Sequence, residues 1–237
     1  MPRRGLAELI LVAACCLAAP FADAAGLRLF DIPADAGSPL TGIVWTPCAA
    51  PASEVVLGGG VVLPGVRDCL INGNRLPLIV VSHRRRGSFL AHNDTAAALA
   101  DAGFVVAAIN HPGDNARDSS RTDEFSVLVE RPAGMKRLTD FMLGAWKEAA
   151  VLDPRRIGFF GFSRGAYTGL VVIGGNPDFG ALATLCQATG ATMPKCEAVR
   201  EGRVPTAAPI HDPALELPSW QIRQSWKAFS VASAWPA

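Results

Sequence analysis

The stretch that decides the fold is Ile157-Gly158-Phe159-Phe160-Gly161-Phe162-Ser163-Arg164-Gly165. It opens with a short apolar run, which is typical of a strand buried on both faces of a sheet. A helix is expected after it, over residues 165–173. Buried strands are also expected over 78–81 and 104–109, and helices over 94–102 and 132–150. This alternation of strand and helix predicts right-handed crossovers and a mostly parallel sheet with helices on both faces.

Other elements are expected ahead of this alternating region. Loosely alternating apolar residues predict two antiparallel strands, over 27–32 and 40–45. Residues 50–76 are rich in Gly, Pro and Asn, so we expect an irregular insertion there.

The deciding stretch contains the pattern G-x-S-x-G between the expected strand and the expected helix. That setting is typical of a nucleophile elbow, a sharp turn that exposes a serine above the N-terminus of the helix. Glycines at 161 and 165 let strand and helix approach without Cβ clashes. Ser163 is therefore the candidate catalytic nucleophile, and the backbone N–H of Arg164 is a candidate donor to a developing oxyanion. The alternative interpretation is a glycine-rich turn with a capping serine.

The loop after the strand at 78–81 reads Ser82-His83-Arg84-Arg85-Arg86-Gly87. In sheets of this kind that loop supplies the second N–H of the oxyanion hole, and Arg85 is the candidate backbone donor. Arg84 stands where glycine is usual, so we expect backbone strain at Arg84 and a distorted oxyanion hole. The three arginines are either a solvated loop or a site beside an anionic group of the substrate.

A second polar segment, Asn110-His111-Pro112-Gly113-Asp114, follows the strand at 104–109. The carboxyl ends of parallel strands share one edge of the sheet, where such sheets bind ligands. His83 and His111 are therefore candidate rim or binding residues beside Ser163. We expect His111 to be a rim or structural residue rather than the catalytic base, because this architecture places its base after the last strand. His92 is expected near the first helix, with no assigned role.

The overall composition is that of a globular protein. Of 237 residues, 50% are apolar and 18% are charged, which argues against a disordered chain and a coiled coil. The length suits one large domain or two small ones. The net charge of +1 provides no long-range field for nucleic acid or an anionic membrane surface. No internal stretch predicts a membrane span, so stable membrane insertion is not expected.

Residues 1–24 have the features of a secretory signal peptide. Two arginines precede a short apolar core over 9–19, and an A-x-A cleavage site ends at Ala24. Cleavage there would export the protein to the periplasm or the medium. The alternatives are a first helix of the domain and a lipoprotein, because residues 12–15 resemble a lipidation box.

Four cysteines remain after this cleavage, an even number that suggests disulfides in an exported protein. Sequence proximity favours the pairs Cys48–Cys69 and Cys186–Cys196, and four buried thiols are the alternative. No cysteine shows the C-x-x-C spacing of a metal site, so no metal is expected.

Three stretches, 78–87, 107–115 and 156–168, together resemble the predicted dienelactone hydrolases. These are exported bacterial α/β-hydrolases, distantly similar to plasma platelet-activating-factor acetylhydrolase, and the resemblance covers residues 27–212. It implies an α/β-hydrolase three-layer sandwich and a Ser-His-Asp hydrolase that acts on a small-molecule ester without a metal or organic cofactor. Dienelactone hydrolase proper uses a cysteine nucleophile, so Ser163 indicates the esterase side of the resemblance.

The chain departs from this family pattern after its nucleophile. The fold orders its triad as Ser, then Asp or Glu, then His, whereas the one downstream histidine, His211, precedes Asp212. No buried strand is evident from Cys186 onward. We therefore expect the C-terminal strands of the sheet, the triad acid and the histidine base to be missing.

Residues 213–237 form an atypical tail that holds three of the five tryptophans and shows no helical or strand period. We wrote the residues from Glu216 onward as GC-rich codons and shifted the reading frame to the third base of the Glu216 codon. The shifted frame can encode AAVVADPAKLESLFGG. This string reads as a buried strand and resembles what the family carries at this point. We therefore expect residues from about 214 to be out of frame. A divergent natural C-terminus is the alternative.

The predicted organisation is a signal peptide (1–24), the N-terminal part of an α/β-hydrolase domain (25–212) and the tail (213–237). The expected function is that of a serine esterase working through an acyl-enzyme, with impaired activity in this chain. The alternative is a non-catalytic hydrolase remnant or a binder of small ligands. No feature of the sequence predicts the oligomeric state.

Overall fold

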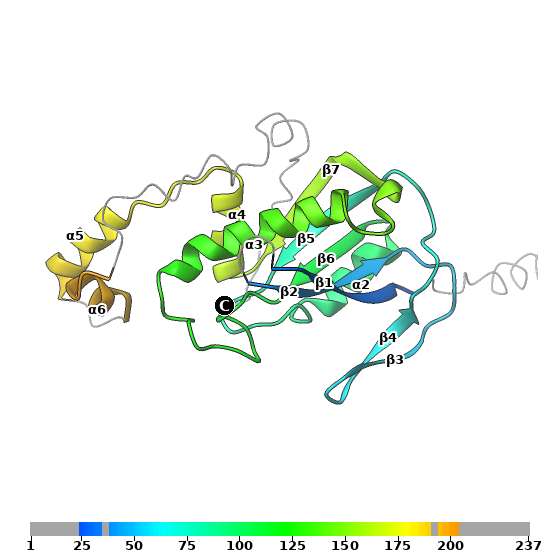
Figure 1. Ribbon diagram of the computed structural model, residues 1–237, viewed down its shortest axis with the longest axis horizontal. Coiled ribbons are helices and arrows are strands. Elements are labelled where there is room, and N and C mark those ends of the chain that lie inside the picture. The colour runs from blue at the N-terminus through cyan, green and yellow to red at the C-terminus, as the bar shows by residue number, and fades with distance from the viewer. Residues whose placement is uncertain (1–23, 35–37, 191–193, 204–237) are drawn as a thin grey trace, which may run out of the picture.

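The computed structural model describes residues 24–34, 38–190 and 194–203. They form a mixed seven-stranded sheet in the order β3-β4-β1-β2-β6-β5-β7, with helices packed on it (Figure 1). The strands are β1 (Gly26–Ile32), β2 (Leu40–Thr46), β3 (Ser53–Gly58), β4 (Val61–Arg67), β5 (Leu76–Ser82), β6 (Val105–Ile109) and β7 (Leu152–Gly161). The helices are α2 (Asn93–Asp101), α3 (Ser126–Leu143), α4 (Arg164–Val172), α5 (Phe179–Thr189) and α6 (Pro194–Arg200), with a short 3-10 helix, η1 (Ala149–Val151).

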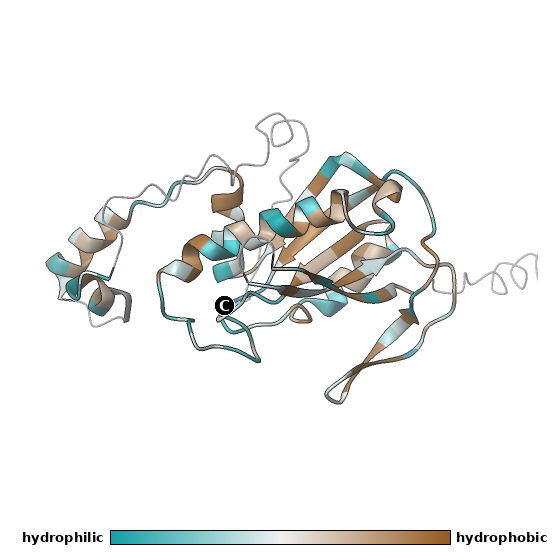
Figure 2. Ribbon diagram, in the orientation of Figure 1, coloured by the Kyte–Doolittle hydropathy of each residue, from teal (hydrophilic) through white to brown (hydrophobic). Residues whose placement is uncertain are grey.

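Helices cover both faces of the central strands, as the alternation of strand and helix predicted. Along β6, successive residues face opposite layers. Ala107 packs in one apolar cluster with Leu138 of α3, and Ala108 packs in another with Ala96 of α2. Burial on both faces is the reason that these strands read as continuous apolar runs, and Figure 2 shows them as the most apolar part of the sheet.

The order of the strands places a topological switch at β5. β5 pairs in parallel with β6 on one side and with β7 on the other. The chain runs from β5 through α2 to β6, and then through α3 to β7. In open α/β sheets, this reversal of direction marks the place beyond the carboxyl ends of the strands where ligands bind.

The first strands of the chain confirm one expectation and correct another. β1 and β2 pair antiparallel, as predicted, and β2 pairs antiparallel with β6, so the sheet is mixed. Residues 50–76 are not an irregular insertion, because β3 and β4 form an antiparallel hairpin. Its turn uses Gly58, Gly59 and Gly60, all at positive φ, where glycine is favoured.

Helix α3 begins before the expected start at residue 132 and ends before residue 145. Pro132 therefore lies inside the helix and is buried, although proline usually starts a helix. The residues before it continue the buried face, since Val127 and Arg131 are buried as well. The predicted stripe is confirmed at Met135, Leu138 and Met142, whereas Ala145 lies beyond the helix and is exposed.

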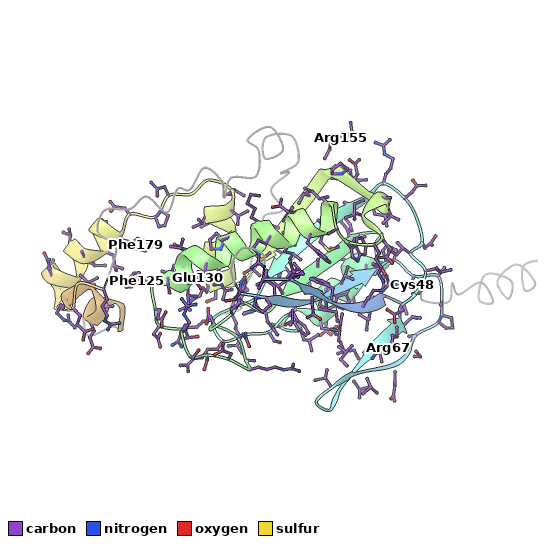
Figure 3. All side chains as sticks on the ribbon, in the orientation of Figure 1. Cys48, Arg67, Phe125, Glu130, Arg155 and Phe179 are labelled. Carbon is purple, nitrogen blue, oxygen red and sulfur yellow. A yellow bond between two sulfur atoms is a disulfide. The ribbon has the colours of Figure 1, made fainter. Side chains whose placement is uncertain are left out.

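Both expected disulfides are present. Cys48–Cys69 joins the segment after β2 to the segment after β4, and Cys186–Cys196 joins α5 to α6. Helices α5 and α6 lie apart from the sheet, beyond the N-terminal end of α3 (Figure 1). Phe125 and Phe179, labelled in Figure 3, connect the two regions through an edge-to-face contact with ring centroids 5.4 Å apart.

Several expectations lie outside the described residues. They are the signal peptide up to residue 23, the out-of-order pair His211 and Asp212, and the tail at 213–237. Within the described ranges, no helix combines the length and the hydropathy that a membrane span needs.

Candidate active site

Ser163 occupies the sharp turn between β7 and α4. Its backbone φ is 55° and its ψ is −118°, a left-handed conformation that is strained for a residue with a Cβ. The strand ends at Gly161 and the helix begins at Arg164. The strand–turn–helix setting expected for the G-x-S-x-G motif is therefore present.

Close backbone contacts require glycine at both ends of this turn. A Cβ on Gly161 would lie 2.4 Å from the carbonyl oxygen of Gly165. A Cβ on Gly165 would lie 1.9 Å from the carbonyl oxygen of Ser82. The second contact places the first turn of α4 directly against the end of β5, so the elbow and the loop after β5 are neighbours.

Two backbone N–H groups in these loops, those of Arg85 and Arg164, make no hydrogen bond to any described residue. The Arg84 carbonyl oxygen accepts a 2.9 Å bond from the N–H of Gly87 and a 2.7 Å bond from the Nδ1 of His83. In a trans peptide the C=O and N–H point in opposite directions. The N–H of Arg85 is therefore turned away from both of these partners.

The strain expected at Arg84 falls on Arg86 instead, whose φ is 54°. The turn closed by Gly87 N–H and Arg84 C=O bends at Arg86, so Arg84 needs no left-handed conformation. A 3.1 Å hydrogen bond from the N–H of Arg86 to Asp114 Oδ1 holds this turn in place.

The side chains of the arginine run lie toward solvent. Arg84 and Arg86 are exposed, and Arg85 pairs with the partly exposed Asp123 at 2.8 Å. An exposed pair of this kind contributes at most about 1 kcal/mol. For Arg85, this contact favours the solvated-loop interpretation over a site beside an anionic substrate group.

His83 and His111 are buried rather than exposed at a rim, because each is only 1% exposed. Of the two roles expected for His111, rim or structural, burial favours the structural one. Arg131 of α3 and the 110–123 loop pack over them at the end of β5. His83 Nε2 accepts a 3.3 Å bond from the N–H of His111, so the His83 proton sits on Nδ1, facing the Arg84 carbonyl.

Burial also sets the charge of these two histidines. Desolvation lowers the pKa of His83 to about 4. Desolvation, with Arg131 and His83 as smaller causes, holds the pKa of His111 well below 6.5. Both rings are therefore neutral at pH 7. His111 Nε2 lies 2.9 Å from Ser82 Oγ, which fits a structural role for His111.

A buried ion cluster that the sequence did not indicate lies beside the elbow. The Oδ2 of the fully buried Asp114 accepts bonds from Arg131 at 2.7 Å and Arg164 at 2.8 Å. Burial raises the pKa of Asp114, but hydrogen bonds from Thr122, Arg164 and the Arg86 backbone outweigh it and lower that pKa. Asp114 is therefore ionised. The three charged residues are far apart in the chain, so no local motif announces the cluster.

His92 lies next to the first helix of the alternating region, as expected, and it also lies beside the elbow. It precedes α2, and its ring meets Phe160 edge-on at 5.0 Å and Phe162 at 6.3 Å. Desolvation, with the nearby charge of Arg84, lowers its pKa. Its Nε2 is buried and has no hydrogen-bond partner among the described residues.

Among the described residues, Ser163 Oγ makes no hydrogen bond, and none of the three described histidines is bonded to it. The structure thus places the turn that carries Ser163 and Arg164 next to the end of β5, where the loop that carries Arg85 begins. Among the described residues, no base is bonded to Ser163. Within the same ranges, no three His, Cys, Asp or Glu side chains are grouped as a metal site.

Residues 91–189 match the prolyl oligopeptidase family, over less than half of the 237-residue chain. A ferulic acid esterase from Streptomyces cinnamoneus superposes with a TM-score of 0.53 at 21% identity, over 66% of this chain and 56% of that one. An acylaminoacyl peptidase from Pyrococcus horikoshii has a TM-score of 0.42 at 14% identity, over 68% and 22% of the two chains. No curated protein sequence matches the chain.

The likeness to the Streptomyces enzyme shows the α/β-hydrolase fold, which confirms the predicted fold class. At 21% identity it shows the fold alone. The chain spans 56% of the length of that esterase.

Proposed function

We propose that this chain is a serine hydrolase of carboxylic esters with Ser163 as its nucleophile. The observation that carries the proposal is the positive-φ Ser163 in the turn between β7 and α4, next to the loop after β5. Two N–H groups without described partners, those of Arg85 and Arg164, come from the loops that meet at this point.

The reaction would follow from this arrangement in two stages. Ser163 Oγ attacks the ester carbonyl carbon, and the resulting oxyanion accepts hydrogen bonds from the N–H groups of Arg85 and Arg164. Collapse of this intermediate breaks the bond to the alcohol oxygen, which takes up the proton that the Ser163 hydroxyl lost on attack, and leaves an acyl-enzyme. Water then attacks the acyl group, releasing the carboxylic acid and restoring the Ser163 hydroxyl.

We also propose that turnover by this chain is weak. A serine hydroxyl is a poor nucleophile unless a base takes its proton, and no described residue is bonded to Ser163 Oγ. His211 and Asp212 stand in the order opposite to that of the fold's usual triad. Loss of one triad member still leaves a rate roughly 10³-fold above that in water, so weak activity remains measurable.

Two likenesses support an ester as the substrate. The sequence resembles the predicted dienelactone hydrolases over residues 27–212, and the superposable Streptomyces enzyme is a ferulic acid esterase. The match to the prolyl oligopeptidase family supports acyl transfer more generally. Serine in place of the cysteine of dienelactone hydrolase proper favours a simple esterase.

We propose an oxidising compartment outside the cytoplasm as the location of the protein. The disulfides Cys48–Cys69 and Cys186–Cys196 support this location. The signal-peptide pattern that ends at Ala24 provides a route to it.

Hydrolysis of p-nitrophenyl acetate tests the proposed function. The purified chain should hydrolyse this ester slowly but above the rate of the Ser163→Ala variant, with both proteins folded by circular dichroism. Equal rates for the two proteins would contradict the proposal and support a non-catalytic remnant or a small-ligand binder. The matching p-nitroanilide distinguishes an esterase from an amidase.

A further inference from the structure

Arg131 of α3 is a charged side chain in the interior of the protein. It is 2% exposed, and its guanidinium donates hydrogen bonds to four different residues. Desolvation lowers its pKa to about 10, with the charge of Asp114 opposing that shift, so Arg131 is still protonated at pH 7. Three of these partners lie in the segments that carry the two candidate oxyanion donors: Ser82 and His83 at the end of β5, and Thr168 in α4.

One set of contacts reaches the loop after β5. Arg131 Nη2 donates to the carbonyl oxygen of His83 and, at 3.1 Å, to Ser82 Oγ. The ring of His83 in turn holds the carbonyl of Arg84 at 2.7 Å. Because that carbonyl belongs to the peptide that carries the N–H of Arg85, these bonds fix the direction of the first donor.

A second set of contacts reaches the elbow. Arg131 Nε donates at 3.2 Å to Thr168 Oγ1, and the Thr168 hydroxyl donates at 2.9 Å to the carbonyl oxygen of Arg164. Asp114, which Arg131 binds at 2.7 Å, holds the guanidinium of Arg164 at 2.8 Å. Arg164 is therefore held through its carbonyl and through its side chain.

The peptide that carries the N–H of Arg164 is held as well, on the other side of the Arg164 Cα. There the Ser163 carbonyl oxygen accepts bonds from the N–H groups of Ala166 and Tyr167. Because the C=O and N–H of one peptide point in opposite directions, these bonds together with those to Arg164 constrain the direction of the second donor.

The cluster also carries an excess of positive charge. Two guanidiniums, of Arg131 and Arg164, share the single carboxylate of Asp114. The two adjoining histidines are neutral at pH 7, because burial depresses both pKa values. One unbalanced positive charge thus lies between the two loops, where it favours negative charge at the oxyanion position.

We propose that Arg131 is the positioning residue of the oxyanion hole, orienting the N–H of Arg85 and the N–H of Arg164 through one buried guanidinium. This inference rests on the proposed function for its catalytic consequence, whereas the positioning itself is independent of turnover. The planar, forked guanidinium of arginine is essential to this role. A lysine ammonium is a compact point charge and cannot bond all four partners of Arg131 at once.

Three variants separate this role from general stabilisation. Arg131→Lys retains the charge and loses the fork. Thr168→Val removes only the connection to the elbow. Arg137→Met is the matched control, because Arg137 lies on the same helix and donates two bonds, to the carbonyl oxygens of Ser38 and Pro33, away from the elbow.

Hydrogen exchange tests the positioning without any need for activity. The N–H groups of Arg86 and Gly87 are bonded in the first loop, and those of Ala166 and Tyr167 are bonded to the carbonyl of Ser163. Arg131→Lys should accelerate exchange over both segments, 84–87 and 164–168, by at least about tenfold. Thr168→Val should accelerate only the second, and Arg137→Met should change neither. The proposal would be overturned if Arg131→Lys exchanged at the parental rate in both segments. It would also be overturned if Arg137→Met accelerated exchange there as much as Arg131→Lys does.

The catalytic consequence is measured as a ratio that does not depend on the amount of folded protein. Oxyanion-hole bonds favour an ester over its thionoester, in which sulfur replaces the carbonyl oxygen. The ratio of kcat/KM for the ester to kcat/KM for the thionoester should fall at least about tenfold in Arg131→Lys, because its oxyanion donors are misdirected. In Arg137→Met the ratio should equal that of the parent protein. An unchanged ratio in an active Arg131→Lys protein would overturn the proposal. Absence of Ser163-dependent turnover in the parent would refute the proposed function instead, and hydrogen exchange would then decide the positioning alone.

Discussion

At the scale of single residues, the site depends on the strained backbone of Ser163 and on two glycines, Gly161 and Gly165, whose lack of a Cβ lets the backbone pack closely. Ser163 holds a φ of 55° in the turn from β7 into α4, a strained conformation that persists where the surrounding structure enforces it. Gly165 allows that path by lying against the carbonyl of Ser82. The position of the nucleophile is therefore determined by backbone contacts as much as by the serine.

Gly165→Ala tests this dependence. The added Cβ would lie 1.9 Å from the Ser82 carbonyl oxygen, so the free energy of unfolding should fall by about 2–4 kcal/mol. Gly158→Ala is the control, because its Cβ would meet Ile79 at an ordinary 3.5 Å, and it should change stability by less than about 1 kcal/mol. Urea denaturation compares the two variants, and equal losses would contradict the close-contact explanation.

Acid stability follows from the two buried histidines. Their pKa values are lower in the folded protein than the ordinary value of 6.5 in the unfolded chain. Below pH 6.5 the unfolded chain binds protons that the folded protein does not, so stability falls as the pH falls. For His83, whose folded pKa is about 4, the loss reaches about 3 kcal/mol by pH 4.

Unfolding midpoints between pH 8 and pH 4 measure this loss. In the parent protein the unfolding midpoint should decrease as the pH falls below 6.5. This decrease should be clearly smaller in His83→Gln, because glutamine cannot gain a proton. Asp114, whose pKa is lowered, contributes stability that is lost only at more acidic pH. Identical slopes for the parent and His83→Gln would show that the buried ring is not the source.

At the scale of elements, the sequence predicted what local pattern determines. The buried strands and the elbow follow from apolar runs and glycine placement, and both are present. The β3–β4 hairpin was missed because short apolar strands are interrupted by consecutive glycines, which read as an irregular loop. The start of α3 was missed because Pro132 suggested a helix start, although tertiary packing buries the turn before it.

The disulfides give a prediction at the same scale. Their sequence separations of 21 and 10 residues correspond to about 3 kcal/mol each in the chain-entropy model. Protein recovered from the periplasm or the medium should begin at Ala25 and yield both linked pairs in non-reducing peptide mapping. All four cysteines found as free thiols in such protein would contradict the pairing, and an intact Met1 would contradict the export.

At the scale of the whole molecule, the fold and the strained turn at Ser163 were predictable, but the buried ion cluster beside that turn was not. Asp114, Arg131 and Arg164 meet only because a loop, α3 and α4 converge beyond the ends of β5 and β7. No local spacing encodes that meeting. The same long-range packing buries His83 and His111, which the loop positions alone placed at the rim.

The frameshift expected from about residue 214 gives a prediction of its own. Restoring the reading frame near residue 214 should add an acid and a histidine base to the elbow. Activity on p-nitrophenyl acetate should then rise by at least about 10³-fold, the scale of a lost triad member. Resequencing the codons for 210–220 is the accompanying check, and an unchanged rate after restoration would contradict the frameshift.

The most direct test of the central claim is covalent labelling of the folded 237-residue chain with a fluorophosphonate, followed by peptide mass spectrometry. Without a base, a hydroxyl held in a nucleophile elbow beside oxyanion N–H groups should be phosphonylated slowly, but still in preference to other serines. We expect a single adduct on Ser163 that is absent from Ser163→Ala and from heat-denatured protein. No adduct on folded protein, or an adduct on another serine that persists in Ser163→Ala, would contradict it.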